Sequence, residues 1–231
     1  MRLHNSLLTA TVQRSAWIAV GILIGLGGTY MTQQIRGHAK PVHFQPRGIT
    51  AAWIPDTVTR WQQDIETQAK RYDVDPNLIA IIMTLESGGD PTADSGQAEG
   101  LMQITPTTAK EIAAKHLRHS ITTNFDIWDP ATNVEFGVAY LAYLRHEFAM
   151  GNSAIETAYT VELVAAGYNG GPGAANNVYL GRGLTDTQTV VYSRDAFNMW
   201  RERGSKTSPT YSRWLERGGQ ALIDAAKKVE K

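Results

Sequence analysis

Glu86 is the first residue of this 231-residue sequence whose type and position indicate chemistry. It closes an apolar run that begins after Asp75, and Gly88 and Gly89 follow it. Apolar neighbours that exclude water raise the pKa of a carboxyl group, and the negative end of a helix dipole raises it further. A carboxyl group that stays protonated near neutral pH can act as a general acid. The alternative is an ordinary surface carboxylate at a helix end.

A second carboxylate is harder to place. Glycosidases of the usual kind hold two carboxyl groups about 5 Å apart for retention or roughly 6.5–9.5 Å apart for inversion. Asp90 and Asp94 lie in the polar segment that follows Glu86 and could fold back toward it. However, Asp90 precedes a proline, and Asp-Pro commonly opens a plain turn. The residues leave the second group open.

Two other segments offer neutral polar groups. Gln103 lies in the short, mainly apolar segment 100–104 that follows the polar loop, here called the return. Its amide could bind an N-acetyl group or a sugar hydroxyl. Tyr168 and Asn169 lie in the Gly- and Pro-rich segment 167–173, which predicts a loop. A solvated glutamine and a simple turn are the plain alternatives. No Gly-Lys-Ser/Thr follows, so this segment is not a phosphate loop.

Composition excludes several other chemistries. The chain has no cysteine, so disulfides, thiolate metal sites and a cysteine nucleophile are ruled out. Of the six histidines, His116 and His119 lie three residues apart without a third ligand in spacing, and we expect neither a metal nor a cofactor. Residues 1–55 carry five basic and no acidic side chains, which leaves a mildly acidic body and argues against a nucleic-acid partner.

The elements that must position these groups read as helices. Apolar residues recur every three or four positions, and the expected helices span about 56–70, 76–87, 106–117, 132–148, 153–166, 174–180 and 189–203, with a terminal helix in the last twenty residues interrupted at 218–219. Residues 204–210 are expected to be flexible. No alternating strand longer than four residues occurs, so the fold class is mainly α, with at most a small β element in 88–104.

The N-terminal region predicts a membrane anchor. No charge occurs between Arg14 and Arg36, and a helix over 15–35 would span roughly 30 Å, about one hydrocarbon core. A cleaved signal peptide is the alternative, although no small-residue cleavage site follows. We therefore divide the chain into a tail and anchor (1–36), a Pro- and Gly-containing linker (37–57), a catalytic domain (58–203) and a C-terminal extension that we expect to be helical (204–231).

Five motifs occur together within this body. They are Tyr72-Asp73-Val74-Asp75-Pro76-x-Leu78, Glu86-Ser87-Gly88, Gly100-Leu101-Met102-Gln103-Ile104-x-Pro106-x-Thr108-Ala109, Asn133-Val134-x-x-Gly137-x-x-Tyr140-Leu141 and Tyr168-Asn169-Gly170-Gly171-Pro172. In this order and spacing they resemble the lytic transglycosylase domain of the soluble lytic transglycosylase (SLT) type, in the lysozyme-like superfamily. The resemblance covers roughly residues 58 to 200.

The resemblance implies a goose-type, lysozyme-like helical domain and assigns roles to single residues. Glu86 would be the lone acid/base, cleaving the bond between N-acetylmuramic acid and N-acetylglucosamine and closing a 1,6-anhydro ring. Ser95 would contact the acetamido group, Met102 and Gln103 would line the cleft, and Tyr168 and Asn169 would orient acid and substrate. No second carboxylate is then needed. Gly167 departs from the family's usual alanine at that position.

It also implies partners and a location. The substrate would be the glycan strands of peptidoglycan, the anchor would lie in the bacterial inner membrane as a single pass, and the catalytic domain would face the periplasm. Secretion to the periplasm after signal cleavage is the alternative. A small anchored body would suit local wall opening for an envelope secretion or conjugation complex. The competing functions are a hydrolytic muramidase and a non-catalytic peptidoglycan-binding scaffold.

Overall fold

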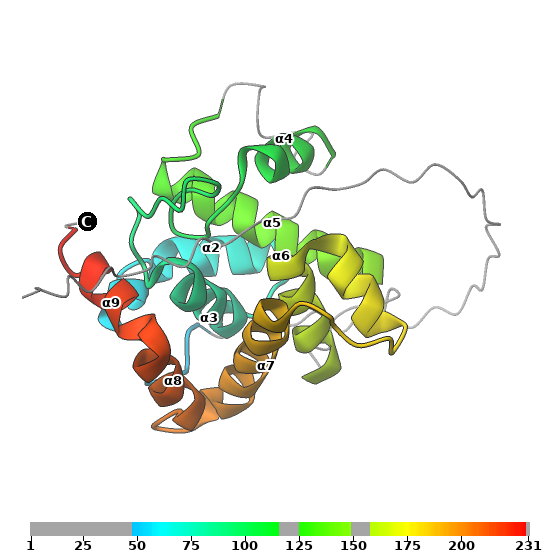
Figure 1. The fold of residues 1–231 in the computed structure, drawn as a ribbon. Coiled ribbons are helices and arrows are strands. Elements are labelled where there is room, and N and C mark those ends of the chain that lie inside the picture. Colours follow the sequence, from blue (N-terminus) through cyan, green and yellow to red (C-terminus); the bar gives the residue numbers. More distant parts are fainter. Residues whose placement is uncertain (1–47, 116–124, 149–157, 230–231) are drawn as a thin grey trace, which may run out of the picture.

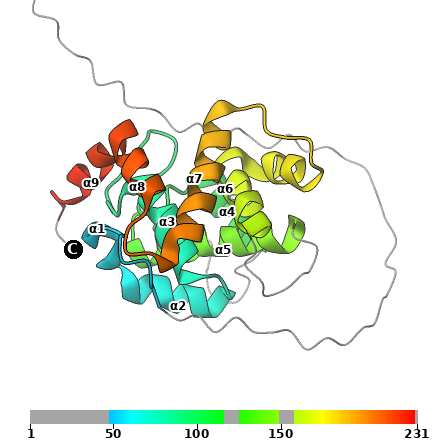
Figure 2. The ribbon, with the colours of Figure 1, turned by 90° about the horizontal axis from the view of Figure 1, so that it is seen from below.

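The computed structural model describes residues 48–115, 125–148 and 158–229, and these form a helical body (Figures 1 and 2). Its α-helices are α1 (Asp56–Thr59), α2 (Gln62–Tyr72), α3 (Pro76–Ser87), α4 (Pro106–Lys115), α5 (Pro130–Phe148), α6 (Ala158–Tyr179), α7 (Thr187–Arg201), α8 (Pro209–Trp214) and α9 (Gln220–Ala226). A 3₁₀ turn (Glu202–Gly204) follows α7, and a π turn (Leu215–Gly219) joins α8 to α9. The prediction of a mainly α fold is confirmed.

The expected β element is small. In the described part of the chain the only β pairing consists of isolated bridges, from Asp94 to Glu99 and from Glu99 to Ile104. Both lie within the 88–104 segment, as the sequence predicted. The expected membrane span at 15–35 lies outside the described ranges, and within those ranges no helix combines the length and apolarity needed to cross a membrane.

Helix α3 lies at the centre of the body, between α2, α7 and the C-terminal helices (Figures 1 and 2). Every residue of α3 is buried, as expected for a helix that is apolar on all sides. The side chain of Asp75 caps its start by accepting a hydrogen bond from the backbone N–H of Asn77, and Pro76 takes the first helical position. The helix ends at Gly88, whose φ of 64° is the left-handed geometry of a helix terminus. Glu86 is thereby placed in the last turn of the most buried helix.

The prediction of a loop at 167–173 is wrong. Helix α6 continues through Tyr168 and Asn169 and breaks only at Gly171 (φ 78°, ψ 176°). The glycines before the break allow close packing: a Cβ on Gly167 would lie 2.8 Å from the Leu144 side chain on α5, and one on Gly170 would lie 2.8 Å from Thr189 on α7. Glycines that signal a turn and glycines that admit a neighbouring helix look the same in a sequence.

The segment 204–210, expected to be flexible, is held in place. The carboxylate of Glu202 accepts hydrogen bonds from the hydroxyl groups of Ser208 and Thr210, the latter at 2.8 Å. The Ser208 hydroxyl in turn caps α8 by accepting from the Tyr211 N–H at 2.9 Å. The predicted interruption at 218–219 is present, with Gly218 at φ 119°.

The C-terminal helices pack on the end of α3 that carries Glu86. A Cβ on Gly88 would lie 2.9 Å from the backbone of Leu222. The Arg60 guanidinium donates to the carbonyl oxygens of Gly89, Ala226 and Val229, at 2.9, 3.1 and 2.7 Å. One cation therefore joins the loop after Glu86 to the last helix of the described chain.

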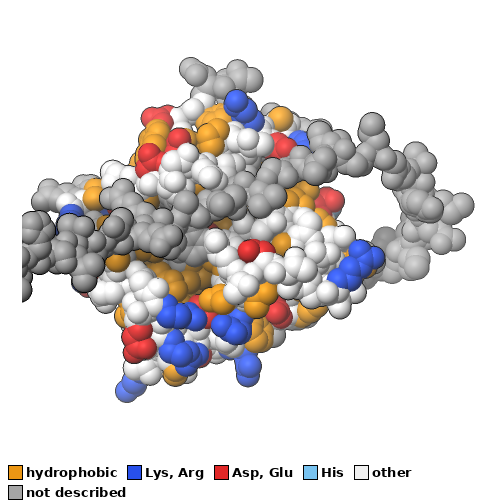
Figure 3. Space-filling view, in the orientation of Figure 1, with side chains coloured by type: hydrophobic (Ala, Val, Ile, Leu, Met, Phe, Trp, Pro, Cys, Tyr) orange, Lys and Arg blue, Asp and Glu red, His pale blue; other side chains and the backbone are white. Residues whose placement is uncertain are grey.

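Charge is unevenly distributed along the sequence from residue 48 onward. Residues 182–231 carry ten basic and six acidic side chains, whereas residues 48–181 carry seven basic and sixteen acidic ones. Figure 3 shows Lys and Arg side chains gathered over α7 and α8. Exposed members of this group are Arg194, Arg201, Lys206, Arg213 and Arg217. Helix α7 thus presents a basic outer face while its inner face packs on α3.

Candidate active site

Glu86 is a nearly enclosed carboxyl group with one strong partner. Only 7% of its surface is exposed, and the Tyr192 hydroxyl of α7 donates to its Oε1 over 2.6 Å. Burial raises the pKa of Glu86 to about 8, and the hydrogen bond from Tyr192 opposes this by favouring the charged form. At neutral pH the group therefore carries a proton that it can donate.

Two tyrosines from different helices face Glu86. The Tyr168 hydroxyl, on α6, donates to the Met102 carbonyl oxygen at 2.8 Å. The pKa values of Tyr168 and Tyr192 are raised well above the ordinary value. Burial is the larger cause, and the negative charge of Glu86 is the next. Both phenols are therefore neutral hydrogen-bond donors at any pH at which Glu86 changes charge.

The return 100–104 is fixed beside them by Asn133, which is 1% exposed. The Asn133 side chain accepts from the Met102 N–H at 2.7 Å and donates to the Glu99 and Ile127 carbonyl oxygens at 2.8 and 3.0 Å. Gly100 passes so close that a Cβ there would lie 2.4 Å from the Asn133 amide nitrogen. The position of the Met102 carbonyl, and with it the Tyr168 hydroxyl, follows from this buried amide.

Met102 and Gln103 lie in this return, but their side chains stabilise the return itself by packing and by hydrogen bonds. Met102 is fully buried and lies where a Cβ on Gly137 of α5 would clash with it. Gln103 has a left-handed backbone (φ 48°), and its amide nitrogen donates to the carbonyl oxygens of Ala93 and Gly100 at 3.0 and 3.1 Å. Both amide hydrogens of Gln103 are thus used to hold the return.

Ser95 and Asn169 have local partners. The Ser95 hydroxyl accepts from the Ala98 N–H at 3.0 Å and closes a turn. The Asn169 side-chain oxygen accepts from the Thr189 hydroxyl at 3.0 Å and so joins α6 to α7. The structure therefore connects Glu86 directly to Tyr192 and groups Tyr168 with Met102, while Ser95 closes the loop between α3 and α4.

The two acidic residues that follow Glu86 most closely in the sequence each stabilise a local turn of the chain. Asp90 accepts from the N–H and hydroxyl of Thr92, both at 2.8 Å, and Asp94 accepts from the Gly96 N–H at 2.6 Å. Both carboxylates are thus engaged in turns of their own loop, whereas a catalytic pair needs a carboxylate free to act opposite Glu86. Among the residues that the structure describes, no three His, Asp or Glu side chains form a metal site; His116 and His119 lie outside those residues.

Tyr192 is the functional group that sequence reasoning missed. The apolar pattern of the expected 189–203 helix pointed to Val190 and Val191, which are only half-buried, whereas Tyr192 is 4% exposed. The available signal was its spacing from Ala196 and Trp200, which places all three on one helix face. A phenol on a buried face needs a hydrogen-bond partner, and a buried carboxyl group is a suitable one.

Comparison with solved structures gives the class of fold. An inactive mutant of the lytic transglycosylase Slt from Pseudomonas aeruginosa superimposes with a TM-score of 0.50 at 21% identity, covering 66% of this chain and 25% of that one. The fold is thus that of a lytic transglycosylase domain. The family model "Transglycosylase SLT domain" matches residues 63–190, more than half of the chain. The chain belongs to the SLT transglycosylase family, as its motifs predicted.

Curated relatives match only part of their own length. The membrane-bound lytic murein transglycosylase E of Buchnera aphidicola is 38% identical over 100 residues, which is 41% of this chain and 44% of that protein. The membrane-bound lytic murein transglycosylase C of Actinobacillus pleuropneumoniae is 37% identical over 117 residues, 50% of this chain and 32% of that protein. The chain therefore spans less than half of the length of these relatives.

Proposed function

We propose that the chain is a peptidoglycan lytic transglycosylase and that Glu86 is its single acid/base. The observation that carries the proposal is the enclosed Glu86 carboxyl group, hydrogen-bonded to Tyr192 and with a pKa of about 8. Membership of the SLT family supports it, and so do the relatives named lytic murein transglycosylases. An acid that is protonated at neutral pH has a direct use in breaking a glycosidic bond.

The reaction needs only one carboxyl group. Glu86 gives its proton to the oxygen between N-acetylmuramic acid and N-acetylglucosamine, and the bond from muramoyl C1 to that oxygen breaks. The resulting carboxylate then takes the proton of the muramoyl C6 hydroxyl, whose oxygen bonds to C1 and closes the 1,6-anhydro ring. No water is consumed, and Glu86 regains its proton. The substrate's 2-acetamido group supports the positive charge at C1 between the two steps.

The neighbouring groups have distinct proposed parts. The Tyr192 hydroxyl stabilises the Glu86 carboxylate between the two proton transfers, because it donates to the oxygen that becomes charged. Tyr168, Asn169, Met102 and Gln103 shape the substrate site, the last two mainly through the backbone of the return. Ser95 contacts the acetamido group, as the family resemblance implies.

Two other functions compete with this one. In a hydrolytic muramidase a water molecule would attack C1, and a second carboxylate such as Asp94 would be expected to assist it. Asp94 instead closes a local turn by accepting from the Gly96 N–H. This favours transglycosylation, which needs no second carboxylate. A non-catalytic wall-binding scaffold would gain nothing from a buried, protonated Glu86, whose burial costs stability as the pH rises.

The test is the Glu86→Gln variant on purified peptidoglycan sacculi, with Asp94→Asn as the matched control. We expect Glu86→Gln to release soluble fragments at least roughly 100 times more slowly than the wild type, the scale of general acid catalysis. Asp94→Asn should keep near-normal release, since an asparagine can close the same turn. Unchanged release by Glu86→Gln would end the assignment of Glu86, and loss of activity in Asp94→Asn would favour a two-carboxylate enzyme.

We also propose that residues 15–35 anchor the chain in the bacterial inner membrane, with the body in the periplasm. Relatives named membrane-bound support this. Alkaline carbonate extraction of cell membranes should leave the intact chain in the membrane pellet. A soluble periplasmic form that lacks the N-terminal segment would establish signal cleavage instead. Service to an envelope secretion or conjugation complex would require copurification with its components.

A further inference from the structure

Helix α3 is tied to α7 at both of its ends. At its C-terminal end, Glu86 accepts the hydrogen bond of Tyr192. At its start, Asp75 accepts a hydrogen bond from the indole N–H of Trp200 at 2.8 Å. Since Trp200 follows Tyr192 by about two helical turns, the two helices run antiparallel and are joined at two points about 12 Å apart along α7.

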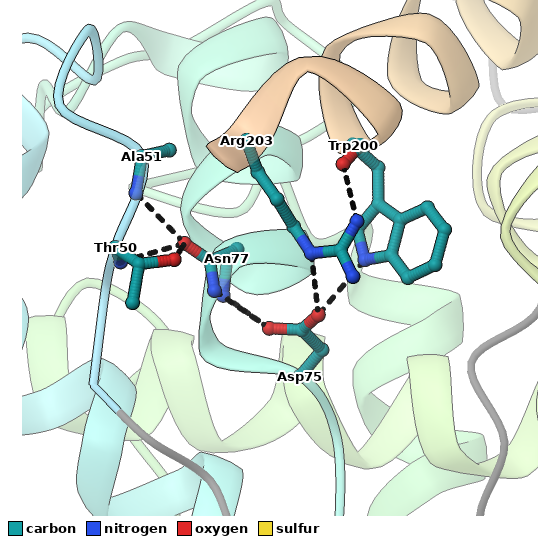
Figure 4. Close-up of polar contacts among 6 residues, drawn as sticks. All are labelled: Thr50, Ala51, Asp75, Asn77, Trp200 and Arg203. Carbon is teal, nitrogen blue, oxygen red and sulfur yellow. Dashed lines mark hydrogen bonds and ion pairs between the residues drawn. The ribbon is translucent and has the colours of Figure 1, made fainter. Parts of the chain in front are cut away.

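The Asp75 contact is more than a helix cap (Figure 4). Asp75 is 1% exposed, and its Oδ1 accepts from the Asn77 N–H and side-chain amide at 2.8 and 3.0 Å. That oxygen alone completes the cap. The second oxygen, Oδ2, is turned to α7, where it accepts from Trp200 and lies 3.6 Å from the Arg203 Nε.

Arg203 holds the Trp200 ring from the other side. Its guanidinium lies 3.7 Å from the centre of the indole ring and donates to the Trp200 carbonyl oxygen at 2.7 Å. The indole is therefore fixed both by the hydrogen bond of its N–H to Asp75 and by the cation over its face (Figure 4). Trp200 is 7% exposed, so an N–H without a partner there would be costly.

The first described residues brace the same point. The Asn77 side-chain oxygen accepts from the backbone N–H groups of Thr50 and Ala51 at 2.8 and 3.1 Å (Figure 4). Asn77 therefore cannot turn its amide away from Asp75 without breaking these bonds. The carboxylate of Asp75 is held from the side of α3 and can act as a fixed point for α7.

We propose that Asp75, acting through Trp200, is a positioning residue that sets α7 along α3 and thereby places the Tyr192 hydroxyl on Glu86. The inference rests on the proposed function of Glu86. A shift of α7 along α3 would lengthen the short Tyr192–Glu86 hydrogen bond, and this bond weakens steeply with distance and angle. The hydrogen bond from Trp200 to Asp75, at the other end of the two helices, prevents such a shift.

The consequence for Glu86 has a definite sign. The titratable groups that face Glu86 are Tyr192 from α7 and Tyr168 from α6, and both are neutral phenols. Of these, the Tyr192 hydrogen bond lowers the pKa of Glu86, while burial raises it. Weakening the bond from Tyr192 therefore raises the pKa of Glu86 further, without any change in charge near the site.

The test is Trp200→Phe in the full-length chain, which removes the indole N–H and retains an aromatic ring. The pKa of Glu86 is followed by NMR of its labelled carboxyl carbon, and kcat by release of fragments from sacculi. We expect the pKa to rise in the direction seen for Tyr192→Phe and kcat to fall roughly tenfold with KM little changed. In a Tyr192→Phe background, Trp200→Phe should produce no further rise.

The controls separate positioning from general damage. Trp214→Phe changes another buried indole, one that stacks on Tyr211, and it should lower Tm without moving the pKa of Glu86. If Trp200→Phe does not fold, Arg203→Gln tests the same pairing from its outer side and should raise the pKa less. An unchanged pKa in the folded variant, or equal rises in both backgrounds, overturns the proposal. The carboxyl titration needs no activity, so it stands even if Glu86→Gln proves active.

Discussion

At the scale of single residues, the site is defined by a carboxyl group that the protein keeps protonated at a cost. Glu86 has a pKa of about 8 in the folded chain, against an ordinary value of 4.5. Burial is the main cause, and the one hydrogen bond from Tyr192 limits it. Such tuning is the usual way in which a carboxyl group becomes a general acid at neutral pH.

The first prediction concerns stability. Because the pKa of Glu86 is raised on folding, its contribution to stability is complete below pH 4.5 and is lost as the pH rises through about 8. Glu86→Gln is neutral throughout, so it should be more stable than the wild type at pH 8 by up to about 4 kcal/mol, and little different at pH 5. Thermal unfolding at both pH values checks this, and a Tm difference that does not grow with pH would contradict it.

The second prediction concerns Tyr192. Glu86 must be protonated to start the reaction, so kcat/KM of the wild type should fall above about pH 8. Tyr192→Phe removes the donor that lowers the pKa, so its alkaline limb should move to higher pH while kcat at pH 6 falls roughly tenfold. Tyr168→Phe, which removes a bond to the Met102 carbonyl rather than to Glu86, should leave the limb in place. Rate–pH profiles of the three proteins decide the matter.

The residue types determine what sequence reasoning could and could not find. Glu86 could be identified because it closes an apolar run and also stands in the Glu86-Ser87-Gly88 motif of the family. Tyr192 could not, because a tyrosine within an apolar helix reads as ordinary core. Its hydrogen-bond partner, Glu86, lies 106 positions earlier in the chain, and no local sequence pattern encodes that contact.

At the scale of elements, close approaches of backbone decide the geometry of the site. The return 100–104 is fixed by the single side chain of Asn133, and α6 bends at one residue, Gly171. The glycines of 167–173 predicted a loop, but helix packing against Leu144 and Thr189 accounts for Gly167 and Gly170. Among the glycines of 167–173, Gly171 alone has a backbone geometry that requires glycine.

The third prediction compares two glycines in this segment. Gly171 has φ 78° and ψ 176°, a region open almost only to glycine, although a Cβ there would meet no atom within 4 Å. Gly171→Ala should therefore destabilise the protein by about 1–3 kcal/mol through backbone strain alone. Gly173→Ala, also without a clash, should be neutral or slightly stabilising. Equal Tm values for the two variants would contradict the assignment of strain to Gly171.

At the scale of the whole molecule, the C-terminal helices are part of the body that holds the site. The family model ends at residue 190, yet α8 and α9 follow it, and α9 packs against the end of α3. The helices themselves could be predicted from their periodicity. The packing of the last helix on the loop after Glu86 could not, because no sequence period identifies which distant surface a helix will cover.

The fourth prediction tests this packing through Arg60. The Arg60 guanidinium reaches its three carbonyl oxygens from two separate nitrogens, whereas the donors of a lysine ammonium all lie on one nitrogen, so Arg60→Lys should cost about 2 kcal/mol. For a body of this size the corresponding fall in Tm is roughly 4–8 °C. Arg194→Lys, at an exposed position on α7, should change Tm by less than about 2 °C. A fall in Tm for Arg60→Lys no larger than that for Arg194→Lys would show that the C-terminal contact carries little stability.

The central claim is that one carboxyl group breaks the glycan strand without water, and product mass tests it most directly. Sacculi are digested with the wild-type chain, and the released muropeptides are measured by mass spectrometry. We predict muramoyl ends that are lighter by one water than those of a hydrolysed strand, and their absence from digests with Glu86→Gln. Products that carry the full mass of hydrolysed ends, and that incorporate oxygen from labelled water, would contradict the account.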